Sequence, residues 1–142
     1  MDIRPYSAQD KAACLAAFDS NVPPFFDPSE RATFEEFLEA MPHPYFVMEH
    51  EGLVAGCGGY AIESDPTLAS LTWGMVRRDL HGNGLGRFLL MFRLREIGRN
   101  PQVNRVRLST APAVVPFFEK LGFRVVAADG LVEMVKKLAV CV

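Results

Sequence analysis

The sequence lacks the cysteine and histidine spacings that build disulfide frameworks or metal sites. Its three cysteines, at positions 14, 57 and 141, lie far apart and include no CxxC pair. This pattern argues against a disulfide framework or a zinc site and fits a reducing cytoplasm, where we expect the protein to act. The three histidines make neither an HxH nor an HxxxH spacing, so we expect no metal cofactor.

The sequence also lacks a large excess of charge of one sign. Its formal net charge is −2 over 142 residues, which favours neither nucleic acid nor an anionic membrane surface as a partner. No run approaches the roughly 18 apolar residues of a membrane span, and the N-terminus shows no apolar segment of a secretion signal. Eleven arginines accompany four lysines; arginine suits phosphate or carboxylate contacts and equally an ordinary solvated surface.

What the sequence does contain is enough apolar material for one core. Hydrophobic residues make up 49% of the chain, which at this length predicts a single domain over residues 1–142. Strand and helix patterns alternate in the order β-α-α-β-β-β-α-β-α-β-β, which predicts an α/β domain with a mixed sheet. We expect helices over residues 8–19, 28–41 and 85–97 and a short helix within residues 111–122 that starts near Pro112 or Ala113. We expect strands over residues 2–6, 45–50, 53–63, 70–77, 105–110, 123–129 and 131–138.

Several local signals mark these elements. Asp27 followed by Pro28 is typical of a helix start, and a stripe of four apolar residues predicts the buried face of that helix: Phe34, Phe37, Leu38 and Met41. We expect hairpin turns at residues 51–52 and 129–130. For the helix over residues 85–97, we expect a broad apolar face formed by Leu85, Phe88, Leu89, Met91, Phe92 and Ile97.

The stretch HGNGLGR, residues 81–87, places three glycines directly before a predicted helix. A bare turn at a helix N-terminus presents free backbone N–H groups and can bind phosphate. A turn that binds nothing is the alternative. A P-loop is excluded because no Lys-Ser or Lys-Thr pair follows the glycines, and a dinucleotide fingerprint fails because Arg87 stands where its last glycine would be.

Two motifs together give the sequence a family resemblance. The segment from Val76 to Arg87 resembles the pyrophosphate motif Q/R-x-x-G-x-G/A of the GNAT superfamily of acetyl-CoA-dependent N-acetyltransferases. Residues 117–123, FFEKLGF, resemble the second signature of that family, and the alternation of Met134, Lys136 and Leu138 is typical of its last strand. The resemblance covers nearly the whole chain and implies a mostly antiparallel sheet of about seven strands flanked by four helices.

The resemblance implies a site for acetyl-CoA as the co-substrate, with no metal. The strand before the glycine turn would pair with the pantetheine arm, with a bulge at Gly74 admitting the thioester. The backbone N–H of Met75 would act as the oxyanion donor. The cofactor-binding residues would be Gly74, Met75, Val76, Gly82, Asn83, Gly84, Gly86, Arg87, Thr110 and Phe118.

A second group of residues is expected to form the acceptor side of the site. The loop between the first two helices usually forms one acceptor wall in this family, and Glu63, at a strand end, is our candidate for the general base. The residues expected to bind the acceptor are Asn21, Phe25, Phe26, Ser70 and Trp73. The acceptor itself is expected to be a primary amine on a small molecule or peptide, and many relatives form homodimers.

The sequence departs from the family pattern at three positions. His81 replaces the usual Gln or Arg and is expected to shape the loop. Thr110 stands near a common Asn. Phe118 replaces the tyrosine that usually serves as general acid, and a phenylalanine cannot protonate a departing thiolate. We therefore expect an N-acetyltransferase that acts by direct attack in a ternary complex, with a non-catalytic acyl-CoA-binding module as the alternative.

Overall fold

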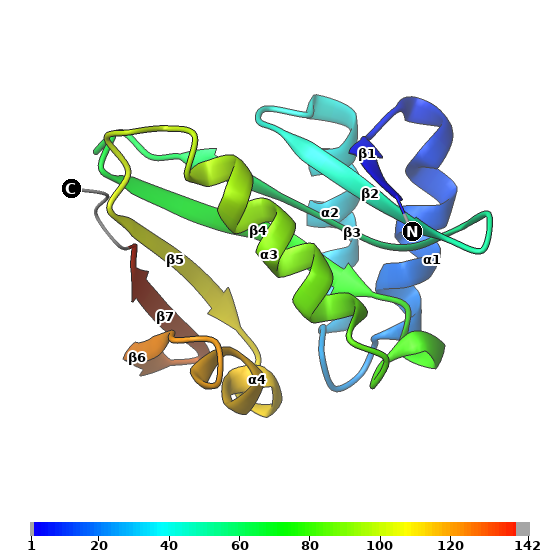
Figure 1. Cartoon of the computed structure of the whole chain (residues 1–142). Coiled ribbons are helices and arrows are strands. Elements are labelled where there is room, and N and C mark those ends of the chain that lie inside the picture. The colour runs from blue at the N-terminus through cyan, green and yellow to red at the C-terminus, as the bar shows by residue number, and fades with distance from the viewer. Residues whose placement is uncertain (1, 139–142) are drawn as a thin grey trace.

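A single seven-stranded sheet organises the computed structural model, which describes residues 2–138 (Figure 1). The strand order across the sheet is β1-β2-β3-β4-β5-β7-β6. The strands are β1 (Asp2–Pro5), β2 (Tyr45–His50), β3 (Leu53–Ile62), β4 (Leu68–Val76), β5 (Arg105–Thr110), β6 (Arg124–Asp129) and β7 (Leu131–Lys137). The helices are α1 (Lys11–Ser20), α2 (Arg31–Ala40), α3 (Leu85–Ile97) and α4 (Val115–Glu119).

The pairing of β4 with β5 differs from every other pairing in the sheet. It is parallel, whereas the other neighbours are antiparallel, and it spans three residue pairs, from Leu68↔Arg105 to Ser70↔Arg107. Beyond Ser70 the two strands separate (Figure 1). The mixed, mostly antiparallel sheet and the element order confirm the expected fold class.

The helices cover both faces of the sheet. α3 lies on one face, and α1 and α2 lie on the other (Figure 1). Phe18 of α1 and Phe34 of α2 are fully buried against residues of β2 and β3. On the opposite face, Leu89 and Leu90 of α3 are buried. Burial of these apolar side chains on both faces supplies the main stabilising free energy of the domain.

The helix start predicted at Asp27 and Pro28 is a short 3₁₀ turn, Pro28–Glu30, which leads directly into α2. The Asp27 carboxylate accepts hydrogen bonds from the Ser29 backbone N–H at 2.9 Å and the Ser29 hydroxyl at 2.7 Å. Glu30 reaches back to the Asp27 N–H at 2.8 Å and completes a capping box. Phe34 and Leu38 are buried, while Phe37 and Met41 pack against the same core, so the predicted apolar stripe is confirmed.

The predicted face of α3 is partly wrong. Leu85, Leu89 and Ile97 are buried as expected, but Phe88 is 42% exposed and Met91 is 48% exposed. Positions 85, 89, 93 and 97 follow the i, i+4 spacing of one helix stripe, and all four are buried. The stripe therefore contains Arg93. Phe88 and Met91 do not share the i, i+4 spacing of this stripe, so they lie on the outer side of the helix although they are apolar.

Both predicted hairpin turns are present. In the β2–β3 turn Glu51 and Gly52 have φ values of +53° and +79°. A two-residue hairpin turn of type I′ requires positive φ at both of these positions. In the β6–β7 turn Gly130 has φ +85°. These turns set the register of the two antiparallel pairs.

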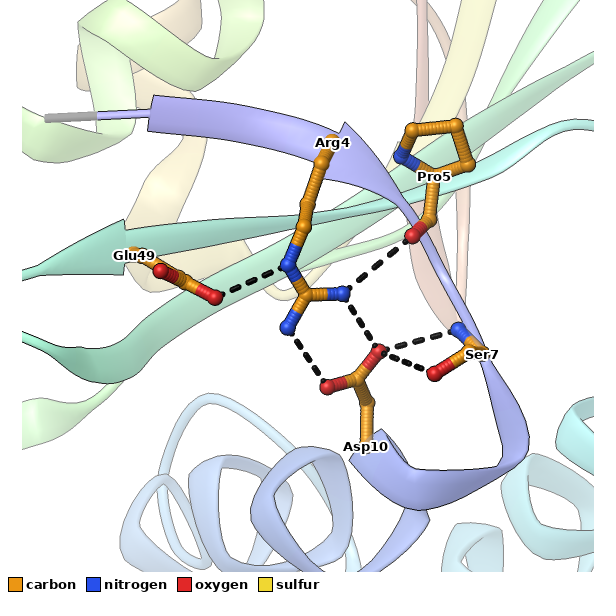
Figure 2. A network of polar contacts seen from close by, with 5 residues as sticks. All are labelled: Arg4, Pro5, Ser7, Asp10 and Glu49. Carbon is orange, nitrogen blue, oxygen red and sulfur yellow. Dashed lines mark hydrogen bonds and ion pairs between the residues drawn. The ribbon is translucent and has the colours of Figure 1, made fainter.

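A network of charged side chains ties β1 to α1 and β2 (Figure 2). The Arg4 guanidinium donates to both carboxylate oxygens of Asp10 at 2.8 Å and, through Nε, to Glu49 at 2.8 Å. Asp10 also accepts from the Ser7 backbone N–H at 2.9 Å. The hydrogen bonds from Arg4 hold the pKa of Asp10 below its usual value, with Ser7 adding to the effect and burial opposing it.

Candidate active site

A cleft of about 850 Å³ opens where β4 and β5 separate. Its walls come from β4, β5, α3 from its start to Arg93, α4 and the loop between α1 and α2. Of the residues that the sequence assigned to the site, Asn83 is absent from the walls and the rest are present: Asn21, Phe25, Phe26, Glu63, Ser70, Trp73, Gly74, Met75, Val76, Gly82, Gly84, Gly86, Arg87, Thr110 and Phe118. The fold therefore brings together residues far apart in the sequence.

The glycine turn forms one end of the cleft. Gly82 and Gly84 have φ values of +82° and +77°, which explains the preference for glycine, and no heavy atom lies within 4 Å of a Cβ placed on either. The first backbone bond of α3 runs from the Phe88 N–H to the Gly84 carbonyl at 3.0 Å. The N–H groups of residues 85–87 have no partner inside the helix, and the helix dipole adds positive potential, so this end suits an anion.

Side chains of the loop stiffen the turn. His81 donates through Nε2 to the Val76 carbonyl at 2.8 Å, since a carbonyl can only accept. The Asn83 amide donates to the Leu80 carbonyl at 3.1 Å, which turns this side chain back onto its own loop. The Phe25 ring packs edge-on against His81, with centroids 5.2 Å apart. His81 therefore shapes the loop, as the sequence suggested.

A bulge interrupts β4 beside the cleft. Cys57 pairs with Met75 and Gly59 with Thr72, so that two residues of β4, Trp73 and Gly74, lie opposite one residue of β3. The bulge predicted at Gly74 is therefore present, and its left-handed residue is the neighbouring Trp73, with φ +43°. The buried Tyr45 hydroxyl donates to the Trp73 carbonyl at 2.8 Å, which holds the bulge in place.

A polar network lies along the shared start of β4 and β5. The Ser70 hydroxyl makes a short hydrogen bond to Glu63 and accepts one from Arg107 Nε at 2.9 Å. Arg107 Nη2 lies 3.7 Å from Glu63 Oε1, and Arg107 Nη1 lies 3.4 Å from Glu133 Oε1. Glu63 is thus fixed at the cleft wall. Arg107 was missed, because one arginine in a strand carries no sequence signal that separates it from a solvated residue.

The remaining predicted positions divide into packing and lining roles. Asn21 is buried, and its amide nitrogen donates to the carbonyls of Ala17 at 2.8 Å and Val76 at 2.9 Å. The atom of this side chain that could still contact the substrate amine is therefore its amide oxygen, Oδ1. Phe26 stacks on Phe18 with centroids 4.8 Å apart, which anchors the loop. Phe118 lines the cleft and packs against Phe123 at 5.6 Å.

Arg93 is a cleft residue that the sequence did not reveal. It is 5% exposed, and its Nη1 donates to the Gly59 carbonyl at 3.4 Å. Burial lowers the pKa of its guanidinium to about 10. Its position in the middle of a predicted helix resembled an ordinary surface arginine, so nothing in the sequence marked it as buried.

Other chemistry has little support in the described part of the chain. Residues 2–138 contain no group of three or more His, Cys, Asp or Glu side chains that could hold a metal. Within the same range no helix is long and apolar enough to cross a membrane. Cys14 and Cys57 are free thiols buried in the core; Cys141 lies outside the described residues. The neighbouring Cys57 thiol and burial both raise the pKa of Cys14.

The split sheet and the bare helix N-terminus together form a cleft whose shape and donors suit an extended anionic ligand. A model of the Acetyltransferase (GNAT) family matches residues 14–123. The chain therefore belongs to this family of acyltransferases. No curated protein matches the sequence significantly.

Solved structures share the fold over almost the whole chain. A protein of the GNAT family from Desulfovibrio desulfuricans has a TM-score of 0.80, 21% identity and coverage of 99% of each chain. The PaiA N-acetyltransferase from Thermoplasma acidophilum, in complex with coenzyme A, has a TM-score of 0.76 and 15% identity over 96% of this chain and 98% of that one. YncA from Salmonella typhimurium, with its cofactor acetyl-CoA, has a TM-score of 0.71 and 21% identity over 98% and 94%. At these identities the likeness establishes the fold alone.

Proposed function

We propose that the protein is a cytoplasmic N-acetyltransferase that moves an acetyl group from acetyl-CoA to a primary amine of a small molecule or peptide. The observation that carries the proposal is a single cleft that joins a bare helix N-terminus to the gap between β4 and β5. A pyrophosphate suits the first feature, and an extended pantetheine arm suits the second. The coenzyme A complexes of structural neighbours support this choice of ligand.

The cofactor would bind along the α3 side of β4. Backbone N–H groups around Gly84, Gly86 and Arg87 would hold the pyrophosphate. The free edge of β4 beyond Ser70 would pair with the pantetheine. The thioester would then reach the bulge at Trp73 and Gly74, where the Met75 N–H would polarise its carbonyl. Thr110 and Phe118 would line the opposite wall.

The acceptor would enter from the side of the α1–α2 loop, past Phe25, Phe26 and Trp73. The neutral amine nitrogen attacks the thioester carbonyl, a C–N bond forms and the C–S bond breaks. Before the attack, Glu63, held by Ser70, would take a proton through water from the ammonium form of the acceptor, and the proton that the nitrogen loses after the attack would pass to water. The sulfur leaves as coenzyme A thiolate, which has a pKa near that of a cysteine thiol, ~8.5, and so departs without a tyrosine acid at Phe118.

The absence of that acid also favours a second candidate, a non-catalytic acyl-CoA-binding module. Phe118 carries no proton to donate, and its ring packs into the core beside Phe123. Two measurements distinguish the candidates. A thermal-shift titration in which acetyl-CoA stabilises the protein and ATP and NAD do not supports both, whereas no shift with acetyl-CoA refutes both. Thiol release with a panel of amines, peptides and polyamines then supports the enzyme, and its absence supports the binder.

The role of Glu63 has its own test. Glu63→Gln should lower the rate at pH 7 more than at pH 9, because more of the amine is already deprotonated at the higher pH. Glu133→Gln is the matched control: Glu133 contacts Arg107 but not Ser70, so we expect no pH-dependent loss there. An equal loss at both pH values for Glu63→Gln would remove it from the base role.

A further inference from the structure

Arg93 is a buried cation in the wall of the cleft that has no anionic partner among the described residues. Its side chain extends from the middle of α3 toward β3 and β4. Its Nη1 makes the long hydrogen bond to the Gly59 carbonyl. Its Nε is buried and has no acceptor within residues 2–138. A guanidinium has five N–H donors, and here only one of them has an acceptor in the described part of the chain, the Gly59 carbonyl. Most of its hydrogen-bonding capacity is therefore unused.

Two glycines let the guanidinium lie close against the backbone of β3 and β4, and one of them, Gly74, lines the cleft. A Cβ on Gly74 would lie 2.6 Å from Nη2, and a Cβ on Gly58 would lie 3.0 Å from Cζ. Any side chain at Gly74 would therefore displace Arg93 or cover it. Gly74 is itself exposed, and both Gly74 and Arg93 line the cleft. The bare backbone at this point keeps the cation next to the bulge where the thioester would lie.

The charge on Arg93 is not neutralised by its neighbours. With a pKa of about 10, the guanidinium stays protonated at pH 7. The groups that face it across the sheet are the Tyr45 phenol and the Cys57 thiol, and burial raises the pKa of Tyr45 well above its usual value, so the phenol is neutral at pH 7. A buried unpaired charge is costly, and a bound anion would relieve that cost.

The position of Arg93 indicates which ligand group could reach it. Trp73 and Met75 pack on the α1 and α2 face, whereas Gly74 faces α3. An acceptor entering past Phe25 and Phe26 would approach from the α1–α2 side. A group on the thioester would extend from the bulge along the α3 face, toward Arg93. Leu71, Leu90 and Leu108 line the cleft there and supply apolar contact for methylene carbons.

We propose that the acyl site accepts a coenzyme A thioester whose acyl group ends in a carboxylate, as in a malonyl or succinyl group, and that Arg93 binds that carboxylate. The proposal rests on the proposed function, because it requires the cleft to take a coenzyme A thioester. It extends that function from acetyl transfer to transfer of a dicarboxylic acyl group. Charge-assisted hydrogen bonds from a guanidinium to a carboxylate give the selectivity.

The test is calorimetric titration of the full chain with five ligands: coenzyme A, acetyl-CoA, butyryl-CoA, malonyl-CoA and succinyl-CoA. Butyryl-CoA is the uncharged control of similar size. We expect the tighter-binding of the two carboxylate thioesters to bind about tenfold or more tightly than butyryl-CoA. In Arg93→Met this ratio should fall to about one. Arg93→Lys, which keeps the charge, should retain part of it, and Arg95→Met, on the exposed side of the same helix, should leave it unchanged.

The possible outcomes separate the two proposals. If neither coenzyme A nor any thioester binds, both fail. If coenzyme A and acetyl-CoA bind but neither carboxylate thioester binds more tightly than butyryl-CoA, the assignment to Arg93 fails and the proposed function stands. Equal ratios in wild type and Arg93→Met would also overturn the assignment. If Arg93→Met fails to fold, Arg93→Lys is compared with wild type. A lower preference for the carboxylate thioester over butyryl-CoA in Arg93→Lys supports the assignment, and an unchanged preference overturns it.

Discussion

The junction of β1 with α1 and the wall of the cleft each contain an arginine, and the two differ in whether the positive charge has an anionic partner within residues 2–138. Arg4 is part-exposed and is bonded to two carboxylates, with Asp10 alone accepting from both terminal nitrogens (Figure 2). Arg93 is buried and contacts one carbonyl at long range. We therefore expect the paired arginine to contribute to stability, and the unpaired one to lower it and to remain available to a ligand.

The same contrast holds for the backbone around each arginine. At the junction, the Ser7 N–H donates to Asp10, so the polar groups are used internally. In the cleft, Gly82, Gly84 and Gly74 carry no side chain, and the N-terminus of α3 has free donors. A region that satisfies its own polar groups is suited to holding the fold, and a region that leaves them unsatisfied is suited to binding. Substitutions in the two regions should therefore have separable effects.

The largest expected effect is the loss of cofactor binding in Gly84→Glu. The new carboxylate would occupy the open space at the start of α3 and repel the pyrophosphate, so affinity for coenzyme A should fall by about 100-fold or more, as measured by calorimetry. Gly52→Glu is the matched control: Gly52 has nearly the same φ, +79°, and the same empty surroundings, but lies in the β2–β3 turn. Retained affinity in Gly84→Glu would refute the phosphate assignment.

The sequence marked the glycine turn as one end of the cleft, with Asn83 alone turned away from it, but gave no signal for Arg93 and Arg107 at the other end. The turn is local in the chain, so seven consecutive residues carry the whole signal. The polar residues of the other end come from separate elements: Glu63 follows β3, Arg107 lies on β5 and Arg93 on α3. Their meeting depends on where β4 separates from β5, which no local pattern encodes. Gly74 lies in the bulge as predicted, but its close approach to Arg93 could not be predicted for the same reason.

A second, smaller effect is expected at the junction. Asp10→Asn removes the charge and one acceptor oxygen, so the free energy of unfolding at pH 7 should fall by about 1–2 kcal/mol, measured by urea denaturation. Affinity for coenzyme A should not change. Asp2→Asn, on an exposed residue of β1 without a side-chain hydrogen bond among residues 2–138, is the control and should have no effect. Loss of coenzyme A binding in Asp10→Asn would contradict the separation of the two regions.

The effect at Asp10 should depend on pH. The pKa of Asp10 is lower in the folded than in the unfolded chain, so the unfolded chain binds the proton more readily in acid. The stabilisation is therefore complete above the unfolded value of about 3.9 and is lost as the pH falls through the folded value. Denaturation curves of wild type and Asp10→Asn should converge below about pH 4. A constant difference down to the lowest pH would show that the ion pair is not its cause.

At Arg93 the expected change has the opposite sign. Arg93→Met replaces an unpaired buried charge with an apolar side chain of similar length, so the ligand-free protein should gain about 1 kcal/mol in the free energy of unfolding. Arg95→Met, on the exposed side of α3, should change stability by less than about 0.5 kcal/mol. If Arg93→Met is instead destabilising by more than its control, then the Gly59 carbonyl and the surrounding dipoles compensate the charge, and the contrast with Arg4 would not hold.

The smallest effect is the coupling between the two sites. Asp10 and Arg93 share no hydrogen-bond partner, and they lie on different elements, one at the start of α1 and the other on α3. The double variant Asp10→Asn/Arg93→Met should therefore show the sum of the two single changes within about 0.5 kcal/mol. The measurement is urea denaturation of all four proteins at pH 7. A larger deviation would mean that the sheet transmits strain from the β1–α1 junction to the bulge, so that the region that holds the fold also tunes the site that binds.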